Sequence, residues 1–151
     1  MEIASQISVP IVLAIQSRTA TPTVTALDVA TAPGGPFNAV HLVVYTGPGG
    51  ITFSETNSLA WRLEHSVDGV AWSAVTAGDV RGAAGQPITV GANGTVEAYT
   101  SAKSQASSNL YVYTGGRRFV RLTPVFSGTH GTGTITGALA ILSGALVLPV
   151  A

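Results

Sequence analysis

The stretch that most constrains the fold is residues 59–75, LAWRLEHSVDGVAWSAV. Trp61, Leu63 and His65 alternate with charged or polar side chains, and this period of two predicts a half-buried strand. An Asp-Gly pair follows, and both residue types tolerate the positive φ angles that tight hairpin turns require. A return strand is expected beyond it, around Trp72. These residues predict the central hairpin of an all-β domain.

Short apolar segments separated by Gly- and Pro-rich turns continue on both sides of this hairpin. The further segments expected to be strands are 23–31, 39–46, 88–90, 95–99, 110–113, 117–126 and 134–142. Residues 77–85 are the one weak candidate for a helix, with a loop as the alternative, and residues 101–109 are expected to form a polar loop. The pattern predicts a jelly roll or β-sandwich of about eight short strands.

The N-terminal residues 1–20 carry an apolar segment that is interrupted by Pro10. Within sheets Pro is confined to edges and strand starts, because it cannot donate a backbone hydrogen bond. We therefore expect an extended N-terminal arm or edge strand over residues 1–20. Residues 21–151 are expected to form a single β-sandwich domain.

Charge is scarce in this chain. Only 9% of the 151 residues are charged, 46% are hydrophobic, and seven basic and seven acidic residues give a net charge of zero. Globular domains usually carry about 25% charged residues, and low charge protects poorly against association. We therefore expect other protein to cover much of the surface, in a homo-oligomer such as a dimer or trimer or in a larger assembly. Nucleic-acid binding is not expected, because it depends on neutralising phosphates.

The chain has no cysteine, which excludes disulfides and Cys-based metal sites and fits assembly in the cytosol. No secretory signal is expected at residues 9–15, because Glu2 precedes this apolar run instead of a basic segment. The apolar run at residues 138–151 contains Gly144 and Pro149, and it is shorter than the about 20 residues of a membrane helix. It predicts a buried strand followed by a docking tail, without a membrane span.

No catalytic constellation is evident in the sequence. His41, His65 and His130 lack the spacing of metal ligands. We expect His41 and His65 to be hydrogen-bonded imidazoles of the core or a sheet face, and His130 to be exposed in a loop. There is no G-x-S-x-G nucleophile elbow, and the glycine-rich pieces lack the spacing of phosphate-binding loops. The aspartates have turn or strand-end explanations: Asp28, Asp68 and Asp79. Neither enzymatic activity nor a cofactor is expected.

Candidate contact residues lie at both termini and at one arginine pair. They are Ile7, Val9, Ile11, Arg117, Arg118, Leu146 and Leu148. Two interpretations of the arginine pair stand side by side: an interface patch that binds carboxylates, or an exposed strand start. Trp61 is expected in the core because it shares a face with Leu63. Trp72 either packs on the hairpin or offers a stacking platform for a sugar ring.

The segment LEHSVDGVAW, residues 63–72, resembles the strand-turn-strand of discoidin-type and other jelly-roll carbohydrate-binding modules. It is also similar to the Asp-box turn of sialidases, S-x-D-x-G-x-T-W, but has one residue fewer between Asp68 and Trp72. The resemblance implies a carbohydrate-binding module, on a phage fibre or a secreted enzyme, in which Trp72 stacks on the ligand.

A second resemblance covers more of the chain, mostly residues 59–144. The segments WRLEHSVDGVAWSAV, AGDVRG and YTGGRRFVRLTPVFSGTHGTGTITGALAILSG, in this order, resemble small virion proteins of tailed bacteriophages. The resemblance implies a jelly-roll cement, or decoration, protein that bridges subunits of the major capsid protein. Its place would be the capsid surface of the virion, after assembly in the host cytoplasm. Within the virion, a tail-tube, head-completion (head–tail connector) or baseplate role is the alternative.

Overall fold

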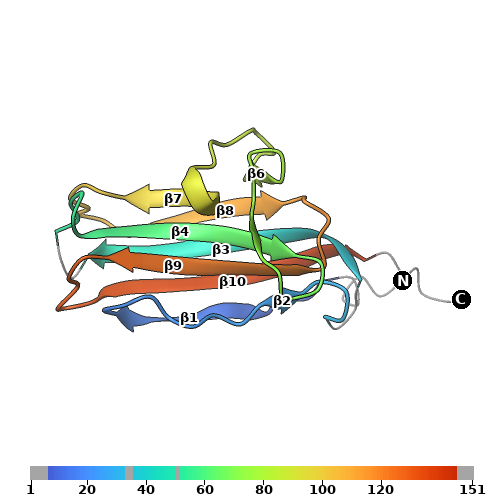
Figure 1. The fold of residues 1–151 in the computed structure, drawn as a ribbon, viewed down its shortest axis with the longest axis horizontal. Coiled ribbons are helices and arrows are strands. Elements are labelled where there is room, and N and C mark those ends of the chain that lie inside the picture. The colour runs from blue at the N-terminus through green and yellow to red at the C-terminus, as the bar shows by residue number, and fades with distance from the viewer. Residues whose placement is uncertain (1–6, 33–35, 50–51, 146–151) are drawn as a thin grey trace, which may run out of the picture.

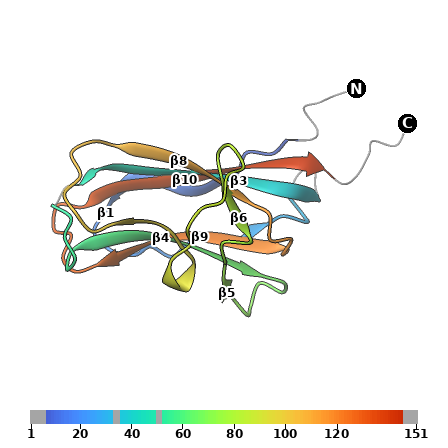
Figure 2. The same ribbon diagram turned by 90° about the horizontal axis from the view of Figure 1, so that it is seen from above.

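The computed structural model describes residues 7–32, 36–49 and 52–145. It is an all-β sandwich of two antiparallel sheets, elongated along the strands (Figures 1 and 2). The first sheet has the order β1 (Ile11–Arg18), β10 (Thr134–Ala145), β3 (Phe37–Gly49), β8 (Ser107–Tyr113) and β6 (Val80–Gly82). The second has the order β2 (Leu27–Asp28), β9 (Phe119–Ser127), β4 (Ser58–Ser66) and β5 (Ser73–Ala74), and β7 (Thr95–Tyr99) also pairs with β4. The prediction of a β-sandwich is confirmed.

One hydrophobic core fills the space between the sheets. Successive strand residues point to opposite faces, so alternate residues of each sheet meet in the interior. The buried apolar side chains of the four long strands include Phe37, Val40, Leu42 and Val44 of β3, Leu59, Trp61 and Leu63 of β4, Val120 and Leu122 of β9, and Ala138, Ala140 and Leu142 of β10. The expectation that Trp61 belongs to the core is confirmed, since none of its surface is exposed.

Trp61 also connects the two sheets through the only polar atom of its side chain. Its indole Nε1 donates a hydrogen bond of 2.8 Å to Oγ1 of Thr46, and Thr46 on β3 is itself fully buried. A buried tryptophan needs such a partner, because an unsatisfied buried N–H is costly. The bond therefore fixes the position of β4 against β3 in addition to filling the core.

The central hairpin is present, but its return strand is short. β5 pairs with β4 at only two positions, whereas β9 pairs with β4 along all of Ser58–Ser66. In the turn, Oδ1 of Asp68 accepts hydrogen bonds from the backbone N–H groups of Val70 and Ala71, each at 2.9 Å. The main partner strand of β4 is therefore distant in sequence, and the hairpin strand β5 contacts only the C-terminal end of β4.

Four of the predicted segments differ from the strands observed. Residues 23–31 contain only the two-residue β2, and residues 88–90 form no strand, although Ile88 and Val90 pack against the core. Residues 77–85 contain β6 and no helix. The polar segment 101–109 was expected to be a loop, but β8 begins at Ser107 because this residue pairs with Thr46 of β3. For β6 and for the start of β8, pairing with a neighbouring strand outweighs local composition, whereas residues 88–90 and most of 23–31 form no such pairing and stay outside the sheets.

The N-terminal segment forms an edge of the first sheet. β1 pairs antiparallel with β10, and two backbone hydrogen bonds between Ser8 and Leu142 extend this alignment towards the N-terminus. Pro10, which lies at this edge as its residue type requires, accepts a hydrogen bond from the Ala140 N–H at 3.0 Å. Residues 8–18 thus follow β10 as an edge strand, and no free arm occurs among the described residues of the N-terminal segment.

The two tryptophans should differ sharply in their contribution to stability. Trp61→Ala removes a fully buried side chain and leaves Thr46 unpaired, so we expect a loss of about 3–5 kcal/mol in the free energy of unfolding. Trp72→Ala is the matched control: this side chain is partly exposed, and its loss should cost about 1 kcal/mol or less. Urea denaturation of both variants measures the difference, and equal losses would contradict the assignment of Trp61 to the core.

Candidate functional site

The outer face of the first sheet is apolar. Strand pairing aligns Ile11 of β1, Leu139 of β10, Val43 of β3 and Leu110 of β8 in one row across four strands. The next row contains Ile141, His41 and Val112. β3, β8 and β10 include no Lys, Arg, Asp or Glu. This surface, called here the apolar face, consists of the outward residues of β1, β10, β3 and β8.

A hollow of about 440 Å³ lies in the apolar face beside β1. Gly137 supplies part of this space, since a Cβ atom at its position would collide with Ile15. The hollow is lined mainly by apolar side chains: Ile11, Leu13, Ile15, Val43, Tyr45 and Leu139. Ile11 and Ile15 are 77% and 67% exposed, which is unusual for isoleucines that neighbour one another on a sheet.

The predicted contact residues near the N-terminus belong to this surface. The alignment of Ser8 with Leu142 and of Ile11 with Leu139 places Ile7, Val9 and Ile11 at alternate positions of one edge. All three are exposed, at 50%, 57% and 77%. Their role as contacts stays a prediction. Leu146 and Leu148 lie outside the described residues.

The arginine pair divides into two different environments. Arg118 forms an ion pair with Asp28, with Nη2 and Oδ2 2.7 Å apart and two further hydrogen bonds from Nε. The Arg118 guanidinium holds the pKa of the Asp28 carboxyl well below its usual range. This ion pair connects β2 to the residue directly before β9. The backbone N–H of Arg117 donates a hydrogen bond of 3.0 Å to Oη of Tyr113. Its side chain is exposed and forms no ion pair within the described residues, so it is better placed than Arg118 to contact an outside partner.

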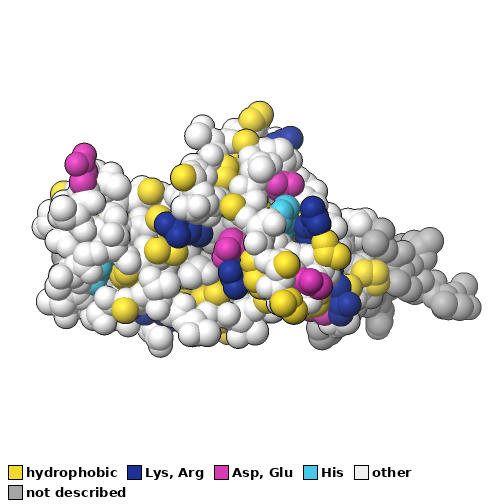
Figure 3. Space-filling model, in the orientation of Figure 1, with side chains coloured by type: hydrophobic (Ala, Val, Ile, Leu, Met, Phe, Trp, Pro, Cys, Tyr) yellow, Lys and Arg dark blue, Asp and Glu magenta, His cyan; other side chains and the backbone are white. Residues whose placement is uncertain are grey.

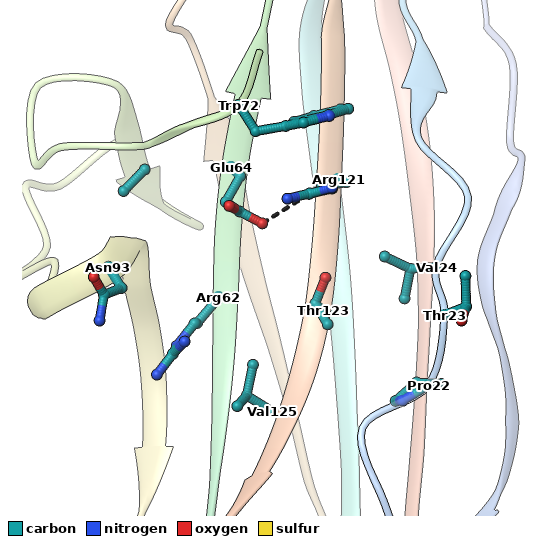
Figure 4. Close-up of a pocket in the computed structure, with 11 residues that line it drawn as sticks. Pro22, Thr23, Val24, Arg62, Glu64, Trp72, Asn93, Arg121, Thr123 and Val125 are labelled. Atoms are coloured by element: carbon teal, nitrogen blue, oxygen red, sulfur yellow. Dashed lines mark hydrogen bonds and ion pairs between the residues drawn. The ribbon is translucent and has the colours of Figure 1, made fainter. Parts of the chain in front are cut away.

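The outer face of the second sheet carries a polar groove of about 550 Å³ (Figure 4). Charged side chains gather near the middle of this face (Figure 3). Arg62 and Glu64 of β4 and Arg121 and Thr123 of β9 form the floor, because Arg62 pairs with Thr123 and Glu64 pairs with Arg121. Trp72 closes one end of the groove. The sequence singled out Trp72 but not the four floor residues. Their alternation along each strand can be read from the sequence, but the pairing of β4 with β9 that brings them together cannot.

The three histidines occupy separate environments. His41 is half-buried and lies 3.2 Å from Oγ of Ser143, as its interpretation as a hydrogen-bonded sheet-face residue predicts. His65 is buried, with Nδ1 2.9 Å from Oη of Tyr113. The expectation that His130 is exposed was wrong: it is 2% exposed because its loop folds back and packs the ring edge-on against Phe126. No group of three or more potential metal ligands occurs among the described residues.

The fold and its surfaces define a β-sandwich with one apolar and one polar outer face. Comparison with known proteins gives no relative: no protein-family model, no curated protein and no solved structure matches the chain. In the described part of the chain, no helix is long and apolar enough to cross a membrane.

His65 should make stability depend on pH. Burial is the main cause that lowers its pKa from the ordinary value of 6.5, and nearby Asp79 opposes the shift. The unfolded chain therefore binds a proton at a higher pH than the folded chain does. The free energy of unfolding consequently falls as the pH drops below about 6.5 towards the lowered pKa of the folded state. Urea denaturation between pH 7.5 and 5 should show this loss in the natural chain and less of it in His65→Gln. An identical pH profile in both would contradict the assignment to His65.

Proposed function

We propose that this chain is a structural protein of a virus particle, a capsid cement protein of a tailed bacteriophage. The apolar face of the first sheet is the observation that carries the proposal. One row of aliphatic side chains runs across it from β1 to β8, and Ile7, Val9 and Ile11 extend the apolar surface along the edge. Exposed apolar surfaces of this kind mark protein interfaces. The major capsid protein is the partner that we assign to it.

The strand order supports the finer description of the fold as a jelly roll. Without the two shortest strands of the β4–β7 connection, β5 and β6, eight strands remain: β1–β4 and β7–β10. The first sheet then has the order β1-β10-β3-β8 and the second β2-β9-β4-β7. This interleaving of chain-order neighbours between two sheets is the arrangement of two Greek keys in a jelly roll.

The energetics favour many copies on a lattice. Burial of apolar surface contributes about 25 cal/mol per Å², whereas association costs about 4–15 kcal/mol in lost freedom. A single small face therefore binds weakly, but copies that also contact one another gain through multivalency. We assign the apolar face to the capsid surface of the virion and the charged second sheet to the outside. Homo-oligomers, such as dimers or trimers, would form through surfaces outside the area that contacts the capsid.

The test is incorporation into particles. Ile11→Lys introduces a charge in the apolar face at a position that is 77% exposed, so the fold should tolerate it while lattice binding falls by about tenfold or more. Val70→Lys is the matched control, because Val70 is 82% exposed in the turn after β4, away from this face. Co-sedimentation with capsid shells that lack the protein measures binding.

The heat resistance of the same particles provides the second readout. Shells decorated with the natural chain or with Val70→Lys should resist heating better than bare shells, and shells treated with Ile11→Lys should not. Equal binding by both variants, or bare shells as heat-resistant as decorated ones, would contradict the proposal. Electron microscopy of the particle separates the head surface from a head–tail connector or baseplate position.

A further inference from the structure

The groove on the second sheet has the features of a ligand site that the assembly role does not use. Its floor is β4 and β9, one wall is the segment 22–24, and Asn93 lies on the opposite side (Figure 4). Its volume of about 550 Å³ falls in the usual range of small-molecule sites, about 300–1,000 Å³. Both donors and acceptors line it, together with apolar side chains of Pro22, Val24 and Val125.

Arg121 is held in place from two sides. Its guanidinium carbon lies 4.2 Å from the centre of the Trp72 ring, and its Nε donates to Oε2 of Glu64 at 2.7 Å. This ion pair leaves the two terminal nitrogens of Arg121 outside the bond to Glu64. Because the guanidinium covers one face of the indole, Trp72 acts here as a positioning residue for Arg121, and a sugar ring could not stack on that same face.

Arg62 lacks a counter-charge. Its Nε is buried and has no hydrogen-bond partner, and neither of the two ion pairs found in the described residues includes it. The Arg62 side chain is only half-buried on the groove floor, so its terminal nitrogens, which make no ion pair within the described residues, are open to a partner from outside. Two arginines against one glutamate give the groove floor a net charge of +1, by 2 − 1.

We propose that this groove binds a saccharide that carries a carboxylate, such as a hexuronic acid unit of an acidic polysaccharide. The carboxylate would bind to Arg62 and the terminal nitrogens of Arg121, since guanidinium groups match carboxylates in a two-pronged geometry. Sugar hydroxyls both donate and accept, so they suit Glu64, Thr123 and Asn93. The carboxylate of Glu64 on the floor disfavours densely charged ligands, such as nucleic acids or an acidic peptide. The proposal rests on the groove alone and is independent of the capsid role.

The experiment measures binding of trigalacturonate to the full chain by titration calorimetry, with the carboxyl-reduced, neutral trisaccharide as the matched ligand. We expect the acidic form to bind at least about tenfold more tightly than the neutral form. Arg62→Gln should remove this preference, whereas Arg81→Gln, an arginine outside the groove, should leave it unchanged. Trp72→Ala should weaken binding by releasing Arg121, and Trp72→Phe should restore it because a ring face remains.

The indole N–H resonance of Trp72 places the ligand in the natural chain, so the test stands even if a variant fails to fold. A shift of that resonance on addition of trigalacturonate is the expected result. No saccharide binding, equal binding of the acidic and neutral forms, or an unchanged affinity in folded Arg62→Gln would overturn the proposal. So would binding of a poly-glutamate peptide through Arg62 in the absence of saccharide binding.

Discussion

The hydrogen bond between Trp61 and Thr46 is the contact on which the rest of this sandwich depends. This bond fixes the position of Trp61, the largest core side chain, between β4 and β3. The aliphatic side chains of both sheets pack around the indole ring. Further bonds cross between the sheets on the side of β8, from Tyr113 to His65 and from Tyr111 to Glu97. Burial raises the pKa of Glu97, as expected for a carboxyl group drawn into this seam.

The alternation that builds the core also creates the two outer faces. Every inward residue has outward neighbours, so the composition of the same strands decides what each face can contact. In the first sheet these outward residues are mostly apolar and include the aliphatic row from Ile11 to Leu110. In the second sheet they include Arg62, Glu64 and Arg121. One face therefore suits protein contact, and the other suits a polar ligand.

Internal bonding decides which candidate residues remain free for partners. Arg118 neutralises Asp28, and His130 packs into an aromatic cluster, so both serve the fold. Arg117 and the isoleucines of β1 stay exposed. Trp72 occupies an intermediate position, because its ring holds Arg121 at the end of the groove. Side chains that look equivalent in the sequence, such as Arg117 and Arg118, differ in the tertiary contacts that they make, and these contacts decide whether they stay free for a partner.

The sequence by itself determined the all-β class, the burial of Trp61 and Leu63, and most of the long strands, and it left the segment with Pro10 as either an arm or an edge strand. These features depend on local alternation and on turn residues, which can be read along the chain. The tertiary structure decided the pairing of β4 with β9, which places Glu64 beside Arg121, and of β10 with β3, which aligns the apolar rows. Such pairings join residues far apart in sequence, and a shift of one residue would exchange the two faces of a strand.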